Sequence, residues 1–137
     1  MKDFNTKKLG AVGKFGEDAA VQLLVEKGYE IIGRNIVCDN NEIDIIARDM
    51  KYIVFVEVKT RTAYNGISRF GSAASAVDKN KQERIYAGAK SFLKGNPQRR
   101  VPRYDVIEVY VNKQITILRF KESITFPKPL AAGDKEV

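Results

Sequence analysis

Two short segments that carry acidic residues, Glu42-Ile43-Asp44 and Glu57-Val58-Lys59, constrain the fold of this chain most strongly. Each lies in a run rich in β-branched and aromatic residues, 43–47 and 52–58. Between these runs, Asp49-Met50-Lys51 has the composition of a turn. The pattern therefore predicts a β-hairpin.

The spacing about this turn predicts which side chains meet. Because side chains alternate along a strand, Glu57 and Lys59 share one face and the valines of the same strand line the other. A hairpin centred on residues 50–51 sets Asp44 opposite Glu57 and Glu42 opposite Lys59. Like charges at roughly 5 Å destabilise a sheet, and a cation between Asp44 and Glu57 would remove that cost. Two acids and a lysine around a divalent metal are the groups of a phosphodiester-cleaving site.

A structural interpretation stands beside this one. Glu42 and Lys59 would form an ordinary cross-strand ion pair, while Asp44 and Glu57 would face solvent on an exposed sheet. The apolar residues around them instead favour strands near the middle of a sheet, where charges are costly unless paired or metal-bound. These apolar residues are Ile45, Ile46, Ile53, Val54, Phe55 and Val56.

The composition bounds the class of protein. With 137 residues, 44% of them hydrophobic, we expect a single domain over 1–137, with a core at about 9–126 and flexible ends at 1–8 and 127–137. The chain contains no histidine, which excludes Ser-His-Asp and Cys-His sites and His-ligated zinc. Cys38 is the single cysteine and is interpreted as a small buried hydrophobe. The basic N-terminus lacks the apolar run of a signal peptide, and we expect a soluble, cytoplasmic protein.

The formal charge of +7 is unevenly distributed. The stretch from Thr60 to Tyr104 contains ten Lys and Arg residues and only two acids, Asp78 and Glu83. A basic stretch that begins where the Glu-Val-Lys strand ends suits a polyanion passing over the acidic site. A solvated basic helix face is the structural alternative, and an anionic membrane is disfavoured because no broad apolar face accompanies the charge.

The remaining pattern predicts the order helix, three strands, helix, two strands. The first predicted elements are a helix over 12–27 stopped by Gly28, a strand over 29–37 interrupted at Gly33-Arg34-Asn35, a turn at Asp39-Asn40-Asn41, and the hairpin. They are followed by a helix that starts after its N-cap Asp78 and runs to about Lys94, and by strands over 104–111 and 114–120 around Asn112-Lys113.

Three charged residues outside the hairpin carry two interpretations each. Glu17 shares the apolar arc of the first helix, as an ordinary first-turn glutamate or as a third carboxylate aimed at the sheet. Lys81 precedes the apolar stripe of the second helix and either snorkels to water or points into the site. Asp105 is either paired with an arginine such as Arg103, which we favour, or a site residue. The segment 60–77 lacks periodicity and is typical of a binding loop, with Arg61, Tyr64, Arg69 and Phe70 offered to phosphates and bases.

A set of motifs in this order closely resembles the YraN family of small bacterial proteins, assigned to the PD-(D/E)XK restriction-endonuclease-like superfamily. The motifs are Gly13-x-x-Gly16-Glu17, Arg34-Asn35, Glu42-Ile43-Asp44, Phe55-Val56-Glu57-Val58-Lys59-x-Arg61, Lys81 and Arg103-Tyr104-Asp105-Val106. The resemblance runs from about Leu9 to Phe126. It implies an α/β (α+β) fold with a restriction-endonuclease-like core, in which two main helices flank a central mixed sheet of about five strands in αβββαββ order.

The resemblance also implies roles for residues. Asp44 and Glu57 would be metal ligands, Lys59 the catalytic lysine, and Glu17 the helix acid that often completes the metal site. Gln82 and Tyr86 fit the Gln-x-x-x-Tyr spacing of RecB-like nucleases. No proline precedes the aspartate, and Asn41 stands where the family has glycine, a change that a left-handed turn tolerates. Candidates for holding the ligands are Glu42 and Gln82, and candidates for nucleic-acid contacts are Arg61, Tyr64, Arg69, Lys81 and Arg84.

The expected function is Mg²⁺-dependent hydrolysis of nucleic-acid phosphodiester bonds, with Mn²⁺ as a substitute. DNA recognised by structure and not by sequence is the expected substrate, because phosphate contacts carry no sequence information. Lys59 would orient or deprotonate the attacking water, or stabilise the transition state. A non-cleaving module that binds nucleic acid or a protein is the first alternative, and a scaffold with a structural acidic patch is the second. A homodimer is compatible with the sequence.

Overall fold

The computed structural model describes residues 11–62, 79–111 and 116–124, with the side chains of 13–60 and 79–110. Within these ranges the chain forms α1 (Ala11–Glu26), β1 (Glu30–Cys38), β2 (Asn41–Arg48), β3 (Tyr52–Thr62), α2 (Lys79–Gly95), β4 (Val101–Val111) and β5 (Thr116–Ile124). The predicted order of helices and strands is confirmed.

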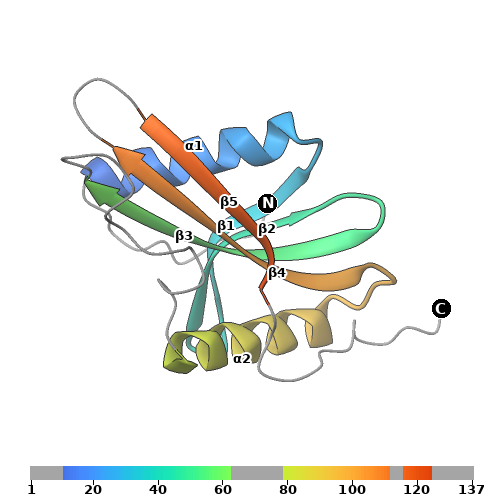
Figure 1. The fold of residues 1–137 in the computed structure, drawn as a ribbon. Helices are drawn as coiled ribbons and strands as arrows, with labels where there is room; N and C mark the ends of the chain where they lie inside the picture. The colour runs from blue at the N-terminus through green and yellow to red at the C-terminus, as the bar shows by residue number, and fades with distance from the viewer. Residues whose placement is uncertain (1–10, 63–78, 112–115, 125–137) are drawn as a thin grey trace.

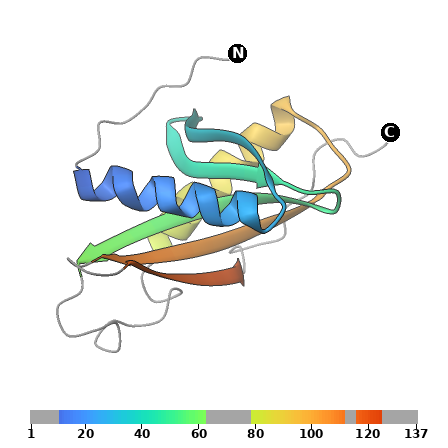
Figure 2. The same cartoon turned by 90° about the horizontal axis from the view of Figure 1, so that it is seen from above.

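The strands form one mixed sheet in the order β1-β2-β3-β4-β5 (Figure 1). Neighbouring strands are antiparallel except β3 and β4, which are parallel over their whole length. A parallel pair needs a long crossover connection, and the connection here contains α2. The helices cover opposite faces of the sheet, as the view from above also shows (Figure 2).

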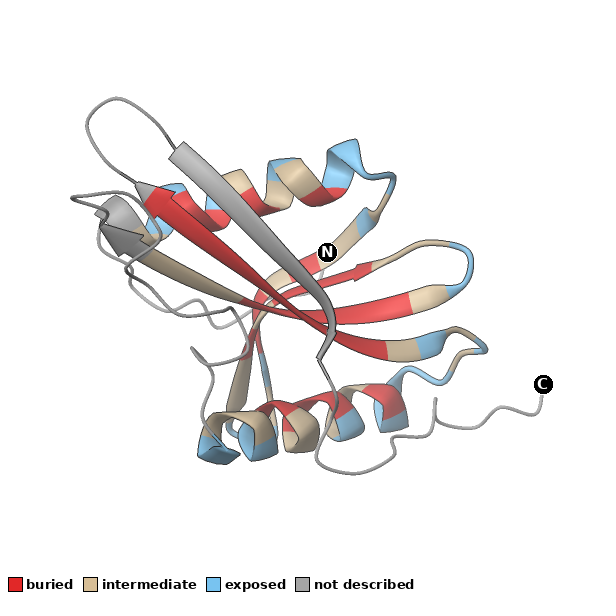
Figure 3. Ribbon diagram, in the orientation of Figure 1, coloured by how far each residue is buried: buried red, intermediate tan, exposed pale blue. Residues whose placement is uncertain are grey.

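Each helix packs on its own hydrophobic cluster. Ala20 and Leu24 of α1 meet alternate residues of the central strands, and Ala89 and Leu93 of α2 meet the intervening ones. The strand residues under α1 are Ile45, Ala47, Val54, Val56, Ile107 and Val109, and those under α2 are Ile36, Ile43, Ile46, Ile53 and Phe55. The buried residues of both helices face the sheet and the exposed ones face away (Figure 3). The helix stripes and the central position of the hairpin strands are therefore confirmed.

The predicted end of the first helix and the predicted turn after the first strand are also confirmed. Gly28 adopts a φ of 97° after α1. Its N–H donates to the Val25 carbonyl, and the Tyr29 N–H donates to the Leu24 carbonyl, which is the bonding of a Schellman cap. At the turn between β1 and β2, Asp39 and Asn40 take φ values of 55° and 62°. Short polar side chains make this left-handed backbone accessible.

The hairpin of β2 and β3 has the predicted register but a shorter ladder. Ile45 pairs with Val56 and Arg48 with Ile53, as a hairpin centred on residues 50–51 requires. The paired region ends at Ile45 and Val56, so the predicted ladder positions of Asp44 opposite Glu57 and of Glu42 opposite Lys59 are both wrong. Glu42 pairs instead with Val37 of β1.

Beyond this point β1 and β2 bend away from β3 toward α2 (Figure 1). Ile43 and Ile45 would share a face in a regular strand, yet Ile43 packs under α2 and Ile45 under α1. Asn35 has a φ of 50°, which bends β1 at the same level as the bend in β2. The bend brings Ile43 against α2 at Gly88, where an added Cβ would lie 3.2 Å from the Ile43 side chain.

Some predictions lie outside the described residues: Tyr64, Arg69, Phe70, the Asp78 cap, the turn at 112–113 and both ends of the chain. For Arg61 the structure describes only the backbone, which belongs to β3. Across the described ranges, neither helix combines the length and apolarity that crossing a membrane would require.

Candidate functional site

Asp44 lies where β2 and β3 separate. Its Oδ2 accepts a hydrogen bond of 2.8 Å from the Val58 N–H, so the side chain takes the place of a ladder partner that β2 no longer offers. Burial, together with the negative charge of Glu57, raises the pKa of the Asp44 carboxyl to about 7. The Val58 hydrogen bond and the charge of Lys81 oppose that rise. Asp44 is thus an acid whose charged form is disfavoured by burial and by a second acid.

Glu57 is the second acid, and it is only 3% exposed. It lies on the α2 face of β3, since Ile53 and Phe55 at the same parity pack under α2. Two lysines approach its Oε2: Lys81 Nζ of α2 lies at 3.3 Å and Lys59 Nζ at 3.9 Å. The predicted sharing of a face by Glu57 and Lys59 is confirmed, and Lys81 points into the site.

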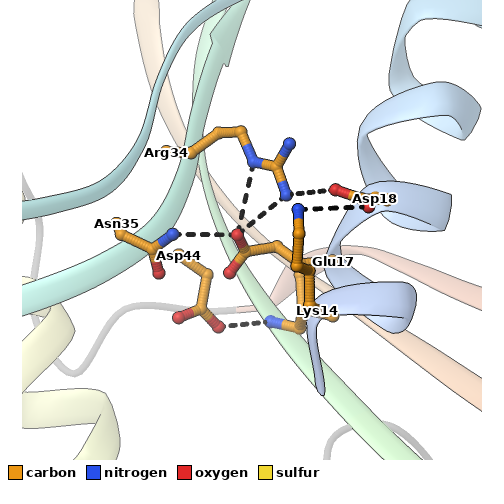
Figure 4. Close-up of polar contacts among 7 residues, drawn as sticks. Lys14, Glu17, Asp18, Arg34, Asn35 and Asp44 are labelled. Atoms are coloured by element: carbon orange, nitrogen blue, oxygen red, sulfur yellow. Dashed lines mark hydrogen bonds and ion pairs between the residues drawn. The ribbon is translucent and has the colours of Figure 1, made fainter. Parts of the chain in front are cut away.

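Glu17 reaches the same region from the opposite face, on α1. Its Oε1 accepts hydrogen bonds from Nε and Nη2 of Arg34 at 3.3 and 3.0 Å and from Asn35 Nδ2 at 2.9 Å. Figure 4 shows Glu17 between these two residues, with Asp44 beside it. The charge of Glu17 also contributes to the raised pKa of Asp44. Glu17 is therefore near the acid pair but is already engaged by Arg34 and Asn35.

Two other carboxylates, those of Glu57 and Glu17, influence the carboxyl of Asp44. Asp44 interacts electrostatically with Glu57 toward α2 and with Glu17 toward α1. Within 13–60 and 79–110, no three His, Cys, Asp or Glu side chains are gathered closely enough to form a ready-made metal cage. Asp44 and Glu57 are accordingly the candidate ligand pair, and Glu17 is held by Arg34 and Asn35.

Sequence reasoning missed Glu108 of β4. It is 1% exposed, and within the described side chains its Oε1 has no hydrogen-bond partner. In the parallel ladder Glu108 pairs with Lys59, so the two residues are neighbours across the strands. Tyr104 of the same strand also interacts electrostatically with the site: burial, and then the charges of Glu57 and Asp44, raise the pKa of its hydroxyl. An isolated acid in a strongly apolar strand was the available signal, but only the β3–β4 pairing gives it a location.

The other predicted residues divide into three groups. Gln82 lies half-buried in the first turn of α2, close to Lys81 in sequence, while Arg84 is exposed on the same helix. Glu42 is half-buried at the bent end of β2. Tyr64 and Arg69 are outside the described residues, as is the side chain of Arg61.

Asp105 belongs to a separate structural cluster. It is fully buried, and Arg103 Nη2 donates to its Oδ2 at 2.8 Å. The same Arg103 nitrogen donates to the Tyr29 hydroxyl at 2.6 Å, and its guanidinium lies 4.7 Å from the centre of the Tyr52 ring. The predicted pairing of Asp105 with Arg103 is confirmed.

Comparison with known proteins places the chain in a family. A model described as "Uncharacterised protein family UPF0102" matches residues 16–109. The chain belongs to the UPF0102 family. A UPF0102 protein of Caldanaerobacter subterraneus subsp. tengcongensis is 44% identical over 115 residues, which cover 83% of this chain and 88% of that protein. A UPF0102 protein of Clostridium botulinum strain Hall is 43% identical over 103 residues, covering 74% and 80%.

The part shared with other UPF0102 proteins contains the whole site, because Glu17, Asp44, Glu57, Lys59 and Lys81 all lie within 16–109. Among solved structures, Pyrococcus furiosus SfsA in complex with Ca²⁺ is similar with a TM-score of 0.40 and 12% identity. The match covers 80% of this chain and 62% of SfsA, and a likeness of this size carries no functional argument.

Proposed function

We propose that this UPF0102 protein is a metal-dependent nuclease of the PD-(D/E)XK type that hydrolyses nucleic-acid phosphodiester bonds. DNA recognised by its structure is the proposed substrate, and the cytoplasm the proposed location. The observation that carries the proposal is the placement of the buried acid Glu57 beside the ammoniums of Lys81 and Lys59, at 3.3 and 3.9 Å, near Asp44 where the strands separate. A raised carboxyl pKa beside a second acid is typical of a functional site.

The chemistry of the two acids fits a hard divalent cation. Carboxylate oxygens are the ligands that Mg²⁺ and Mn²⁺ accept, and Mg²⁺ commonly uses one or two carboxylates with waters and substrate phosphates. A site without a third close carboxylate is therefore sufficient for such an ion. Asp44 and Glu57 would hold this ion, and the chemistry it would supply is polarisation of the scissile phosphate and a lowered pKa of a bound water.

The residues of the chain supply the remaining functions. Lys59 lies on the same face as Glu57 with its side chain one-third exposed, so its ammonium can reach a phosphate oxygen that a substrate brings to the site. There it would orient the attacking water and stabilise the negative charge of the transition state. Exposed cations such as Arg84 would bind the phosphates of the nucleic-acid backbone without recognising the bases.

The test is a cleavage assay in Mg²⁺ and in Mn²⁺ on duplex, single-stranded, flapped and four-way-junction DNA, with matching RNA substrates. We expect metal-dependent cleavage by the wild type and its loss in Asp44→Asn. Asp39→Asn is the matched control, because it makes the same chemical change at the exposed turn between β1 and β2. Cleavage that survives Asp44→Asn would refute the proposed site.

A binding module that does not cut is the second candidate. It is favoured by the two lysines that already approach Glu57, which neutralise the acid without a metal. A wild-type protein that binds branched or single-stranded DNA without metal and shows no turnover in any substrate would identify this function. A second copy of the chain as partner would appear as a dimer in sedimentation experiments.

A further inference from the structure

Two lysines form ion pairs with Glu57 in the described structure, and Lys81 is the closer of the two. Its Nζ lies 3.3 Å from Glu57 Oε2, compared with 3.9 Å for Lys59. Lys81 belongs to the first turn of α2, whereas Glu57 and Lys59 belong to β3. The ammonium therefore comes from a separate element on the α2 side of the sheet.

The charge of Lys81 acts on both acids. It forms an ion pair with Glu57, and it opposes the rise in the pKa of Asp44. Two neighbouring carboxylates favour a cation, and here an ammonium of the chain supplies it. Glu57 is 4% exposed in its side chain, so this pairing occurs in a partly desolvated place where it has more weight than on an open surface.

Lys81 can also leave the pair. Its side chain is 31% exposed, so its ammonium has access to solvent and does not have to cross a packed core to withdraw. A divalent ion carries twice the charge of an ammonium in a smaller radius. A metal that binds both acids would repel Lys81, and the lysine would then be available for a phosphate oxygen.

We propose that Lys81 is the resident counter-ion of the Asp44–Glu57 pair, and that this ammonium and a divalent metal compete for the same two carboxylates. The inference rests on the proposed function, because it concerns the metal of that site. Lys81 is thus a positioning residue that holds the metal-free site together and turns to the substrate when metal enters.

The decisive measurement is Mn²⁺ binding by titration calorimetry to the wild type, Lys81→Met and Lys79→Met. Lys79 is an exposed lysine in the same turn of α2, so its loss makes the same change in net charge without touching the acids. We expect Lys81→Met to bind Mn²⁺ about fivefold more tightly than Lys79→Met, the effect of losing one competing ion pair. Lys81→Arg should bind like the wild type.

Thermal melts provide the second readout. In EDTA, Lys81→Met should melt below the wild type because the acids lose their counter-ion, and in saturating Mn²⁺ the difference should vanish because the metal replaces it. Lys79→Met should match the wild type in both conditions. Equal Mn²⁺ affinity of the two methionine variants would overturn the inference and leave the nuclease proposal standing. If none of the proteins binds Mn²⁺, the inference and the metal-dependent proposal both fail.

Discussion

At the scale of single residues, Asp44 makes the stability of the protein depend on pH. Its carboxyl has an ordinary pKa of 3.8 and a pKa of about 7 in the folded chain. Between these values the folded state retains a proton that the unfolded state has released. The contribution of this protonation to the free energy of unfolding is complete below about pH 4 and is lost as the pH rises through about 7.

We therefore predict that the metal-free protein becomes less stable from about pH 4 to about pH 7 and that Asp44→Asn reduces this slope. At about pH 8 the variant should be more stable than the wild type by about 2 kcal/mol, because the amide removes the charge and can still accept from Val58. Urea titrations in EDTA at several pH values measure this. An Asp44→Asn protein with an unchanged pH slope would show that another group titrates.

Glu17 should behave in the opposite way, because its partners depend on it. It is 4% exposed and its Oε1 accepts hydrogen bonds from both Arg34 and Asn35. We predict that Glu17→Ala costs about 3 kcal/mol in the free energy of unfolding, since it leaves the buried Asn35 amide without its acceptor and removes the buried one of the two acids that pair with Arg34.

Asp18→Asn is the comparison for Glu17→Ala, because Asp18 also pairs with Arg34 but is half-exposed in its side chain. It should cost less than about 1 kcal/mol. Denaturant unfolding at neutral pH separates the two variants. Equal costs would mean that the buried network around Glu17 contributes no more than a surface ion pair.

At the scale of elements, the contact between α1 and β3 depends on Gly16. A Cβ at this position would overlap the Thr60 side chain, which belongs to β3. We predict that Gly16→Ala destabilises the protein by about 2 kcal/mol and shifts α1, with Glu17 on it, away from Asp44.

Two further variants test the Gly16 prediction. Gly95→Ala, at the end of α2, meets open space and should be neutral. Thr60→Ala combined with Gly16→Ala should recover part of the stability, because it removes two of the three overlapping atoms. Thermal melts of the wild type, of Gly16→Ala, of Thr60→Ala and of the variant with both changes form a double-mutant cycle. Additive losses would mean that Thr60 does not limit the approach of the helix.

The boundaries of β4 show how elements depend on their neighbours. The sequence predicts a strand from Tyr104, and the structure begins it at Val101, whose N–H donates to the Lys51 carbonyl. Pro102 has no N–H to donate, and within the described residues the pairing of β4 with β5 begins at Tyr104. The longer strand is a consequence of pairing with β3, which no local pattern reveals.

At the scale of the whole molecule, the uneven charge should control binding to nucleic acid. The ten basic residues of 60–104 would release counter-ions from a bound polyanion, so affinity should fall steeply with salt. We predict that Arg69→Glu with Arg84→Glu weakens binding to all DNA sequences alike. The salt slope should decrease by about 1 for each phosphate that the protein no longer neutralises.

Fluorescence anisotropy at several salt concentrations measures this slope. Lys51→Glu, which reverses one exposed charge at the turn between β2 and β3, is the control for each single reversal and should leave the slope unchanged. A sequence-selective loss of affinity, or an affinity indifferent to salt, would show that the basic segment is a solvated surface.

The sequence by itself determined the local features of this protein. The order of elements, the Gly28 cap, the left-handed turn at Asp39 and the register of the hairpin all follow from spacing within a few residues. The shared face of Glu57 and Lys59 follows in the same way, since strand periodicity is a property of the backbone.

Only the tertiary structure decided how these parts meet. The β2–β3 ladder ends at Ile45, Lys81 lies closer to Glu57 than Lys59 does, and Glu108 lies beside Lys59 because β3 and β4 are parallel. Each of these depends on residues far apart in the sequence. Periodicity specifies which face a side chain occupies, but the helix packed on that face and the strand beside it are set by burying both clusters at once.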